Sequence, residues 1–290
     1  MSLDNPMMSL LNNKFSKVAT RTDIAQHFII NNHILQLITN QIPPGNTVIE
    51  IGAGLGQLTE KLAPLAQKVV AIEIDERFKD RLGSIQKRHS NVEVIIGNAL
   101  KVNFNLYPKS WVVGNIPYHI TEPLFNKMIK TDLKGIVFLV GNSFAQEAMA
   151  IDKDMSKFGK LSMLVITFFK PTLIATVGKE NFEPKPRTES AILKLIPLQL
   201  KDYQQNKNLF LMRQFFLTAS KSPLVKNVLR ESLIRFESLS ITKNEARNLV
   251  AVYGLPEAIL SKPFEQLNNK EYRILYDALQ KGSVIGIEKS

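Results

Sequence analysis

Residues 47–62 read TVIEIGAGLGQLTEKL, and this stretch decides the fold. It joins a short β-branched run to a segment with apolar residues at helical spacing, through a bend that contains Gly52, Gly54 and Gly56. Glycines permit a tight turn and remove Cβ atoms that would keep a ligand from the backbone, and the following helix adds unsatisfied N–H groups. Glycine turns also serve as plain connections, but the position between a strand and a helix favours a binding turn.

Strand-like and helix-like patterns alternate on both sides of this bend. A helical pattern over 31–42 ends at PPG, residues 43–45, and helix-like segments separate further β-branched runs at 68–74, 91–96, 111–115 and 135–141. This alternation predicts an α/β fold with a mainly parallel sheet covered on both faces. Three later apolar runs, 161–169, 172–177 and 190–198, have no long helix between them, so we expect an antiparallel end to the sheet.

The pattern changes near residue 199, after which apolar residues fall at helical spacing and strand-like runs nearly vanish. We therefore expect one domain over residues 1–198 and a smaller, basic, helical domain over residues 199–290.

The charge balance points to a polyanionic partner. The 290 residues include 37 Lys and Arg against 26 Asp and Glu, a formal net charge of +11, which favours nucleic acid or an anionic membrane surface. A solubilising charge excess would look the same in composition. No apolar run approaches the roughly 20 residues that span a bilayer, and no signal-peptide pattern is visible, so we expect a cytoplasmic protein that binds no membrane.

The cysteine and histidine content argues against a metal site. The chain has no cysteine, which excludes disulfides and thiolate ligands and fits a reducing compartment. Four scattered histidines have no metal-ligand spacing: His27, His33, His89 and His119. We expect no metal.

A carboxylate marks the end of the second predicted strand. Glu73 closes the run KVVAIEI, where it could accept hydrogen bonds from both hydroxyls of a ribose. It could instead cap the next helix, but Asp75 and Glu76 already serve that purpose. Dinucleotide enzymes share this geometry with S-adenosylmethionine enzymes. The spacing E-x-G-x-G-x-G, which starts at Glu50, is typical of methyltransferases, whereas G-x-G-x-x-G suits a pyrophosphate.

Two further turns lie at predicted strand ends. Asn98 and Ala99, in IIGNAL, follow the third strand, where the amide could reach a cofactor adenine; an asparagine there is also a common turn former. GNIPYHIT, residues 114–121, follows the fourth strand. An amide oxygen of Asn115 and a backbone carbonyl could accept the two N–H bonds of an adenine amine, Pro117 would stiffen the turn, and Tyr118 would stack on the base. Alone, this segment could be an ordinary proline turn.

Together these motifs resemble the ribosomal RNA adenine N6-dimethyltransferases of the KsgA and Erm types. EIGAGLGQLT and AIEID resemble the cofactor motifs of that family, NIPYHIT its catalytic motif, and AQHFIINNHILQLI its Q-N-F-L segment. The resemblance implies a Rossmann-like class I S-adenosylmethionine-dependent methyltransferase fold with a smaller C-terminal helical domain. S-Adenosyl-L-methionine would be the cofactor.

The resemblance also assigns site residues. It implies cofactor contacts for Gln26, His27, Phe28, Glu50, Gly52, Ala53, Gly54, Glu73, Ile74, Asn98, Ala99 and Asn115. The catalytic residues would be Asn115, Ile116, Pro117, Tyr118 and Phe182, with Phe182 closing over the target base opposite Tyr118. Phe182 belongs to NFEPKPRTESAILKLIP, which resembles the F-x-P-x-P stretch of the family; read alone, it would be a core residue at a strand entry.

The chain departs from the family pattern at three places. Asn98 replaces the usual acid, His119 follows Tyr118 where the family often has Asn, and the basic run of the KsgA type is reduced to Lys221, Lys226 and Arg230. The first departure puts adenine recognition in question, and the third puts ribosome docking in question.

Three functions follow from these observations. The segment FGKLSMLV, residues 158–165, and the length of the helical domain favour a KsgA-type enzyme, a monomer that dimethylates adenines of small-subunit ribosomal RNA during ribosome assembly. An Erm-type enzyme would instead methylate an adenine of 23S ribosomal RNA and give macrolide resistance. A basic assembly factor that has lost turnover is the third possibility, against which the intact Asn115, Pro117 and Tyr118 argue.

Overall fold

The computed structural model describes residues 27–116, 118–150, 155–219, 224–236 and 241–281. Its internal contacts divide the chain into two compact units. The first unit consists of residues 1–145 and 172–195, and the second of residues 146–171 and 196–290. Each unit is described by itself.

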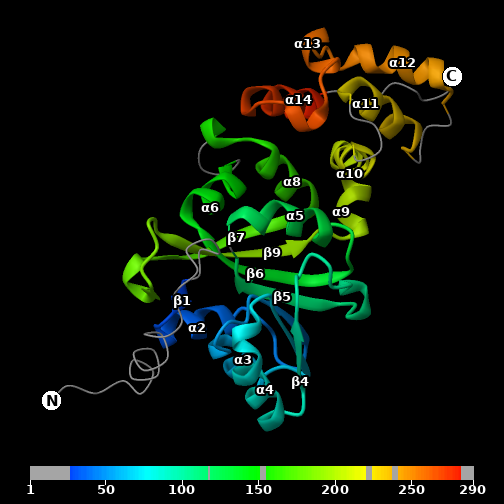
Figure 1. Cartoon of the computed structure of the whole chain (residues 1–290). Helices are drawn as coiled ribbons and strands as arrows, with labels where there is room; N and C mark the ends of the chain where they lie inside the picture. The colour runs from blue at the N-terminus through cyan, green and yellow to red at the C-terminus, as the bar shows by residue number, and fades with distance from the viewer. Residues whose placement is uncertain (1–26, 117, 151–154, 220–223, 237–240, 282–290) are drawn as a thin grey trace. The chain divides into compact units, whose positions relative to one another are not determined.

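The larger sheet has seven strands in the order β4-β3-β2-β5-β6-β9-β7. Figure 1 labels five of them, β4, β5, β6, β9 and β7. The strands of this sheet are β2 (Thr47–Ile51), β3 (Lys68–Glu73), β4 (Val92–Ile96), β5 (Ser110–Asn115), β6 (Leu133–Gly141), β7 (Phe169–Val177) and β9 (Ser190–Pro197). The first five pair in parallel, and β9 is antiparallel to β6. The mainly parallel sheet with an antiparallel end is therefore confirmed.

The burial pattern explains why these runs became central strands. Every residue of Val48–Ile51 and of Val69–Glu73 is buried, as are the residues of β6 from Gly135 onward. Because neighbouring side chains of a strand point to opposite faces, continuous burial means that both faces of the sheet are covered.

Helices lie before and between the parallel strands of the first unit. They are α2 (Asn32–Thr39), α3 (Gln57–Leu62), α4 (Lys79–Arg88) and α5 (Tyr118–Met128), with 3₁₀ turns at η2 (Glu76–Phe78), η3 (Phe104–Leu106) and η5 (Lys179–Asn181). The predicted cap at Asp75 is confirmed, because its Oδ1 accepts a hydrogen bond from the Arg77 N–H at 3.0 Å. A separate small sheet pairs β1 (Phe28–Ile29) antiparallel with β8 (Phe182–Glu183).

The second unit is helical. Besides α6 (Asn142–Ala148), which begins in the first unit, it contains η4 (Met155–Lys157), α8 (Lys160–Phe168), α9 (Leu200–Gln205), α10 (Lys207–Ala219), α11 (Val225–Ile234), α12 (Lys243–Val252), α13 (Glu257–Leu260), η6 (Phe264–Gln266) and α14 (Asn269–Lys281). Its core holds edge-to-face aromatic pairs in which the Phe264 ring meets Phe215, Phe216 and Tyr272. Among the residues that the structure describes, no helix has the length and apolar character needed to cross a membrane.

One predicted strand is wrong. Residues 161–169 were expected to enter the sheet, but all of them except Phe169 lie in helix α8. Six residues of α8 are buried, including Ser162 and Thr167, so the segment is apolar on nearly every side and shows no helical period. Ser162 Oγ accepts a hydrogen bond from the Gly159 N–H at 3.1 Å and so helps to start the helix.

Helix α8 also changes how the chain divides. It packs against α10 and α14, and the Phe168 ring lies 5.8 Å from that of Phe216. The helical unit therefore includes residues 146–171 as well as residues from Ile196 onward, whereas a single boundary after residue 198 was expected.

Candidate active site

The register of the parallel strands brings three predicted site residues to one edge of the sheet. Ile51 at the end of β2 lies opposite Ile72 of β3 and opposite Gly114 of β5. The residues that follow these three are Gly52, Glu73 and Asn115, so the ends of three strands meet at the glycine bend. A Cβ added to Gly52 would lie 3.7 Å from the backbone oxygen of Asn115.

The Glu73 carboxylate is tied to the glycine bend. Its Oε2 accepts a hydrogen bond from the Gly54 N–H at 2.8 Å, and its Oε1 accepts one from the Asp75 N–H at 2.8 Å. Burial raises the pKa of Glu73 above its ordinary value, and the charge of Asp75 adds to this shift. The backbone donors of Asp75, Gly54 and Ile74 act against it. Each carboxylate oxygen has two lone pairs, so further hydrogen bonds from a ligand remain possible.

A second buried carboxyl, Glu50, lies on the neighbouring strand β2. Its Oε2 accepts a hydrogen bond from the Thr59 hydroxyl at 2.5 Å. Burial raises the pKa of Glu50 to about 8, the Thr59 hydrogen bond opposes the shift, and the charge of Glu73 adds to it. Glu50 is therefore largely protonated at neutral pH when Glu73 is ionised.

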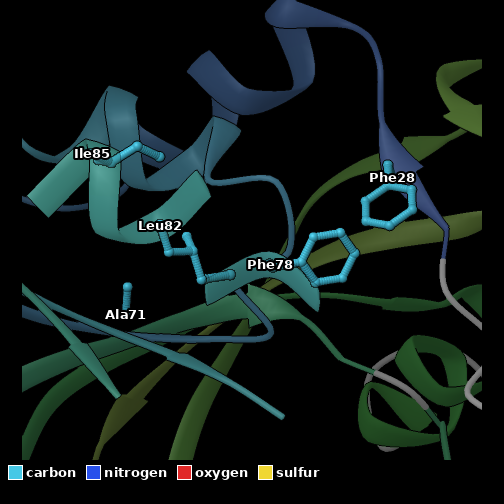
Figure 2. Close-up of a cluster of buried hydrophobic side chains, with 6 residues drawn as sticks. Phe28, Ala71, Phe78, Leu82 and Ile85 are labelled. Atoms are coloured by element: carbon cyan, nitrogen blue, oxygen red, sulfur yellow. The ribbon is translucent and has the colours of Figure 1, made fainter. Parts of the chain in front are cut away.

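Phe28 closes the glycine bend on another side. A Cβ on Gly54, whose φ is +52°, would lie 3.1 Å from the Phe28 ring, so a larger residue would be both strained and crowded there. The Phe28 ring meets that of Phe78 edge to face, with centroids 5.8 Å apart. Figure 2 shows this pair beside Leu82 and Ile85 of α4, and Ala53 completes the same buried cluster.

The amide of Asn115 is held by the segment before β1. Its Nδ2 donates a hydrogen bond to the backbone oxygen of His27 at 2.7 Å. Nδ1 of the His27 ring lies 2.8 Å from the backbone oxygen of Pro184, just after β8. The predicted cofactor residues His27 and Phe28 thus lie beside the predicted catalytic residue Asn115.

The remaining described residues of the predicted site directly follow strands β3, β4 and β5 or lie within three residues of their ends. Asn98 Oδ1 accepts a hydrogen bond from the Leu100 N–H at 2.9 Å, so its oxygen forms a turn, and Ala99 is buried. Ile116 is buried, with its N–H bonded to Leu139 of β6. Ile74 directly follows Glu73 and is 57% exposed.

Phe182 is buried at 1% exposure in β8, where a core residue at a strand entry would be. Its ring is therefore covered by protein. Gln26 and Pro117 lie outside the described residues, and so does the side chain of Tyr118.

Sequence reasoning missed three residues that support the site. Thr59 bonds Glu50, and Gln57 Nε2 donates to the Ile29 oxygen at 3.1 Å. Lys127 of α5 donates from Nζ to the Leu100 oxygen at 2.8 Å and lies over the Phe104 ring, and burial lowers its pKa. The position of Thr59 in the first turn of the helix after the bend could have indicated its contact with the site. Nothing in the sequence around Lys127 indicated its contact with Leu100.

Comparisons with known proteins agree with this geometry. A family model described as ribosomal RNA adenine dimethylase matches residues 17–252. A probable ribosomal RNA small subunit methyltransferase A of Thermococcus sibiricus is 31% identical over 91% of this chain and 93% of its own length.

Two solved structures are also similar. A dimethyladenosine transferase from Plasmodium falciparum is 25% identical with a TM-score of 0.58, covering 86% of this chain and 95% of its own. The 23S rRNA methyltransferase ErmE is 20% identical with a TM-score of 0.56, covering 87% of this chain and 99% of its own. The predicted class I methyltransferase fold with a helical C-terminal part is therefore confirmed.

Proposed function

Because the chain belongs to the ribosomal RNA adenine dimethylase family, we propose that it dimethylates adenine N6 in small-subunit, 16S-type ribosomal RNA. It is an S-adenosyl-L-methionine-dependent methyltransferase that serves ribosome biogenesis. The relative from Thermococcus sibiricus, named for the small subunit, supports this choice of RNA over 23S RNA. The likeness to ErmE, at 20% identity, supports the fold alone.

One observation carries the proposal: the amide of Asn115, the carboxylate of Glu73 and the glycine bend meet at the ends of three neighbouring parallel strands. Ligands of open α/β sheets bind beyond the carboxyl ends of the strands. The Asn115 amide, which can accept a hydrogen bond from an amine, therefore lies near the Glu73 carboxylate, which can accept hydrogen bonds from ribose hydroxyls.

The residues present fit the methyl donor. Glu73 keeps lone pairs for ribose hydroxyls after it accepts the backbone hydrogen bonds from Gly54 and Asp75. The exposed Ile74 beside it offers an apolar face for a purine. Asn98, Ala99, Gly52, Ala53, Gly54 and Glu50 complete the cofactor side, with Gln26, His27 and Phe28 toward the methionine end. When bound, S-adenosylmethionine supplies an electrophilic methyl group on a sulfonium.

Asn115 prepares the target amine. The exocyclic nitrogen of adenine is a weak nucleophile because its lone pair is delocalised into the ring. Hydrogen bonds from that amine to the Asn115 amide oxygen and a backbone carbonyl of 115–117 favour a pyramidal nitrogen with an available lone pair. No strong base is needed, because the methylated amine loses its proton readily to water.

Base stacking completes the proposed acceptor side. Tyr118 would supply one face by its position in the NIPY motif. Phe182 would supply the other only if its ring leaves the buried position that it has here. The target adenine must also leave its helix to reach this edge.

We propose that the enzyme acts as a cytoplasmic monomer on precursors of the small ribosomal subunit and uses no metal. The absence of cysteine and the +11 charge support a reducing compartment and an RNA partner. Of the reduced basic run, Lys226 and Arg230 lie within the described residues and are candidates for contact with RNA. Both already pair with acids, Lys226 with Glu257 and Arg230 with Glu231.

The test is methyl transfer from labelled donor to purified 30S and 50S precursors, followed by mass spectrometry of the RNA. We expect labelled dimethyladenosine in the 30S RNA and no label in the 50S RNA. Label confined to 50S RNA would establish the Erm-type alternative. Binding without transfer would establish an assembly factor that has lost turnover.

A further inference from the structure

We infer that His27 is a positioning residue for methyl transfer: its ring holds its own backbone carbonyl in place, and that carbonyl sets the orientation of the Asn115 amide. The inference rests on the proposed function, because it concerns how the amine-binding oxygen is aimed.

The first step concerns the amide itself. A backbone carbonyl can only accept a hydrogen bond, so the atom of Asn115 that lies 2.7 Å from the His27 oxygen must be the NH₂ group. An amide is planar, with its oxygen and nitrogen on opposite sides of the carbon. Once the nitrogen faces His27, the oxygen faces away from it and has one defined direction. The alternative flip, with oxygen facing oxygen, is repulsive.

The second step concerns how residue 27 is held. Pro184 also presents a carbonyl, so Nδ1 of His27, 2.8 Å away, must carry the proton and donate. His27 lies before β1, outside the ladder that pairs Phe28 with Glu183 and Ile29 with Phe182. The His27 ring therefore adds one more contact between this segment and residues 181–184. That contact is made by the residue whose backbone carbonyl holds Asn115.

The rest of the segment is well anchored. The Ile30 N–H donates to the Asn181 oxygen at 2.9 Å, and Asn31 Nδ2 donates to Asn181 Oδ1 at 2.7 Å. Gln57 of α3 holds the Ile29 oxygen. Loss of the His27 ring contact would thus loosen the end of the segment next to Asn115 and leave β1 paired.

The chemistry of residue 27 gives matched variants. Nδ1 of histidine and Nδ2 of asparagine stand the same number of bonds from Cα, and both can donate. His27→Asn therefore keeps a donor toward Pro184. His27→Asp has nearly the same shape but presents only acceptors, which the Pro184 carbonyl repels, and His27→Ala removes the group.

The kinetic test compares these full-length variants on 30S precursors. We expect His27→Asp and His27→Ala to lower kcat by about 10- to 100-fold, since misplacement of a reacting group costs this much. His27→Asn, which keeps the donor, should retain a kcat several-fold higher than either of them. The RNA KM should stay within about threefold. Equal kcat in all three variants, or equal loss in all three, would overturn the inference.

A second readout does not depend on turnover. The side-chain NH₂ signal of Asn115, identified in ¹⁵N-asparagine-labelled protein by its absence in Asn115→Ala, should shift in His27→Asp and His27→Ala but stay in place in His27→Asn. An unmoved signal in the Asp and Ala variants would overturn the inference. Because this measurement needs no RNA, it separates failure of the positioning role from failure of the proposed function. If His27→Asp does not fold, the comparison of Ala with Asn decides.

Discussion

At the scale of single residues, the site contains two buried carboxyl groups of different roles. Glu73 faces the glycine bend through backbone donors, whereas Glu50 is bonded to Thr59. Two like charges on adjacent strands are costly away from water, so one of them carries the proton first. The pKa of about 8 at Glu50 makes it the proton carrier near neutral pH.

The titration of Glu50 predicts how stability depends on pH. A carboxyl pKa raised from 4.5 to about 8 means that the folded state binds the proton more tightly than the unfolded state. Stability that is present at pH 4.5 is therefore lost as pH rises toward 8. In Glu50→Gln we expect the fall in Tm between pH 6 and pH 8.5 to be smaller than in the wild type, measured by calorimetry. Parallel curves for the two proteins would show that Glu50 is already ionised in the fold.

Substitutions at Asn115 and at Glu73 should affect different steps, catalysis in the first case and donor binding in the second. We expect Asn115→Ala to lower kcat by about 10²- to 10³-fold, because an oriented acceptor for the reacting amine is lost. The donor dissociation constant, measured by calorimetry, should change little. Glu73→Ala is the matched control, with a weaker donor affinity as its first effect. If Asn115→Ala weakens donor binding as much as Glu73→Ala, Asn115 is a structural residue of the donor site.

Individual residues also mark where sequence reasoning reaches its limit. The placement of Glu73 and Asn115 follows from strand alternation, because both close predicted parallel strands. The Asn115–His27 hydrogen bond joins residues 88 positions apart, and no local pattern encodes it. Asn98 turned out to form the turn that asparagines favour, and this alternative was already visible in the sequence.

At the scale of elements, the close approach of β5 to β2 determines whether the site assembles. A Cβ on Gly114 would lie 2.3 Å from the backbone oxygen of Ile51, a distance that only separation of the strands can relieve. Gly83, within α4, has no neighbour within 4 Å of the same added atom. Substitution by alanine should therefore have opposite effects on stability at Gly114 and at Gly83.

We expect Gly114→Ala to destabilise the protein by about 3 kcal/mol, because the nearest atom to the added Cβ is the backbone oxygen of Ile51 in a paired strand, and Ile116 Cδ1 lies only 3.0 Å away. Gly83→Ala should stabilise it by about 0.5–1 kcal/mol through helix propensity. Urea unfolding of both variants measures the difference. A neutral Gly114→Ala would mean that β5 shifts against β2 at little cost.

Helix α8 shows why element type was harder to predict than element position. Its residues are buried on nearly all sides, so neither a period of two nor one of 3.6 appears in the apolar pattern. Val165, Ile166, Thr167 and Phe168 also favour strands by propensity. The packing of α8 against α10 and α14, far along the chain, overrides that preference.

At the scale of the whole molecule, the surplus of positive charge suits the proposed RNA partner, since phosphate contacts supply much of the affinity for nucleic acid. Under the proposed function the first unit would hold the donor and the amine, and the second unit is helical. Charge and domain count could be estimated from composition. Which residues belong to which unit could not, because that depends on contacts between distant segments.

The division into units predicts how a truncated chain behaves. A chain that ends at residue 198 keeps α8 but loses its partners within the helical unit: the Phe158 ring meets Tyr276 at 4.9 Å, Phe168 meets Phe216, and the Thr167 oxygen accepts from the Tyr203 hydroxyl. The apolar rings of Phe158 and Phe168 would then face water. We expect the 1–198 chain to bind the dye ANS and to aggregate, measured by fluorescence and light scattering.

One substitution should have opposite effects in the two chains. In the full-length protein, Phe158 is 1% exposed, so Phe158→Ser should cost about 3–5 kcal/mol of stability through the lost packing. In the 1–198 chain the same change removes exposed apolar surface and should reduce aggregation. A 1–198 chain as soluble as the full-length protein, with no response to Phe158→Ser, would contradict the assignment of α8 to the helical unit and restore a boundary near residue 198.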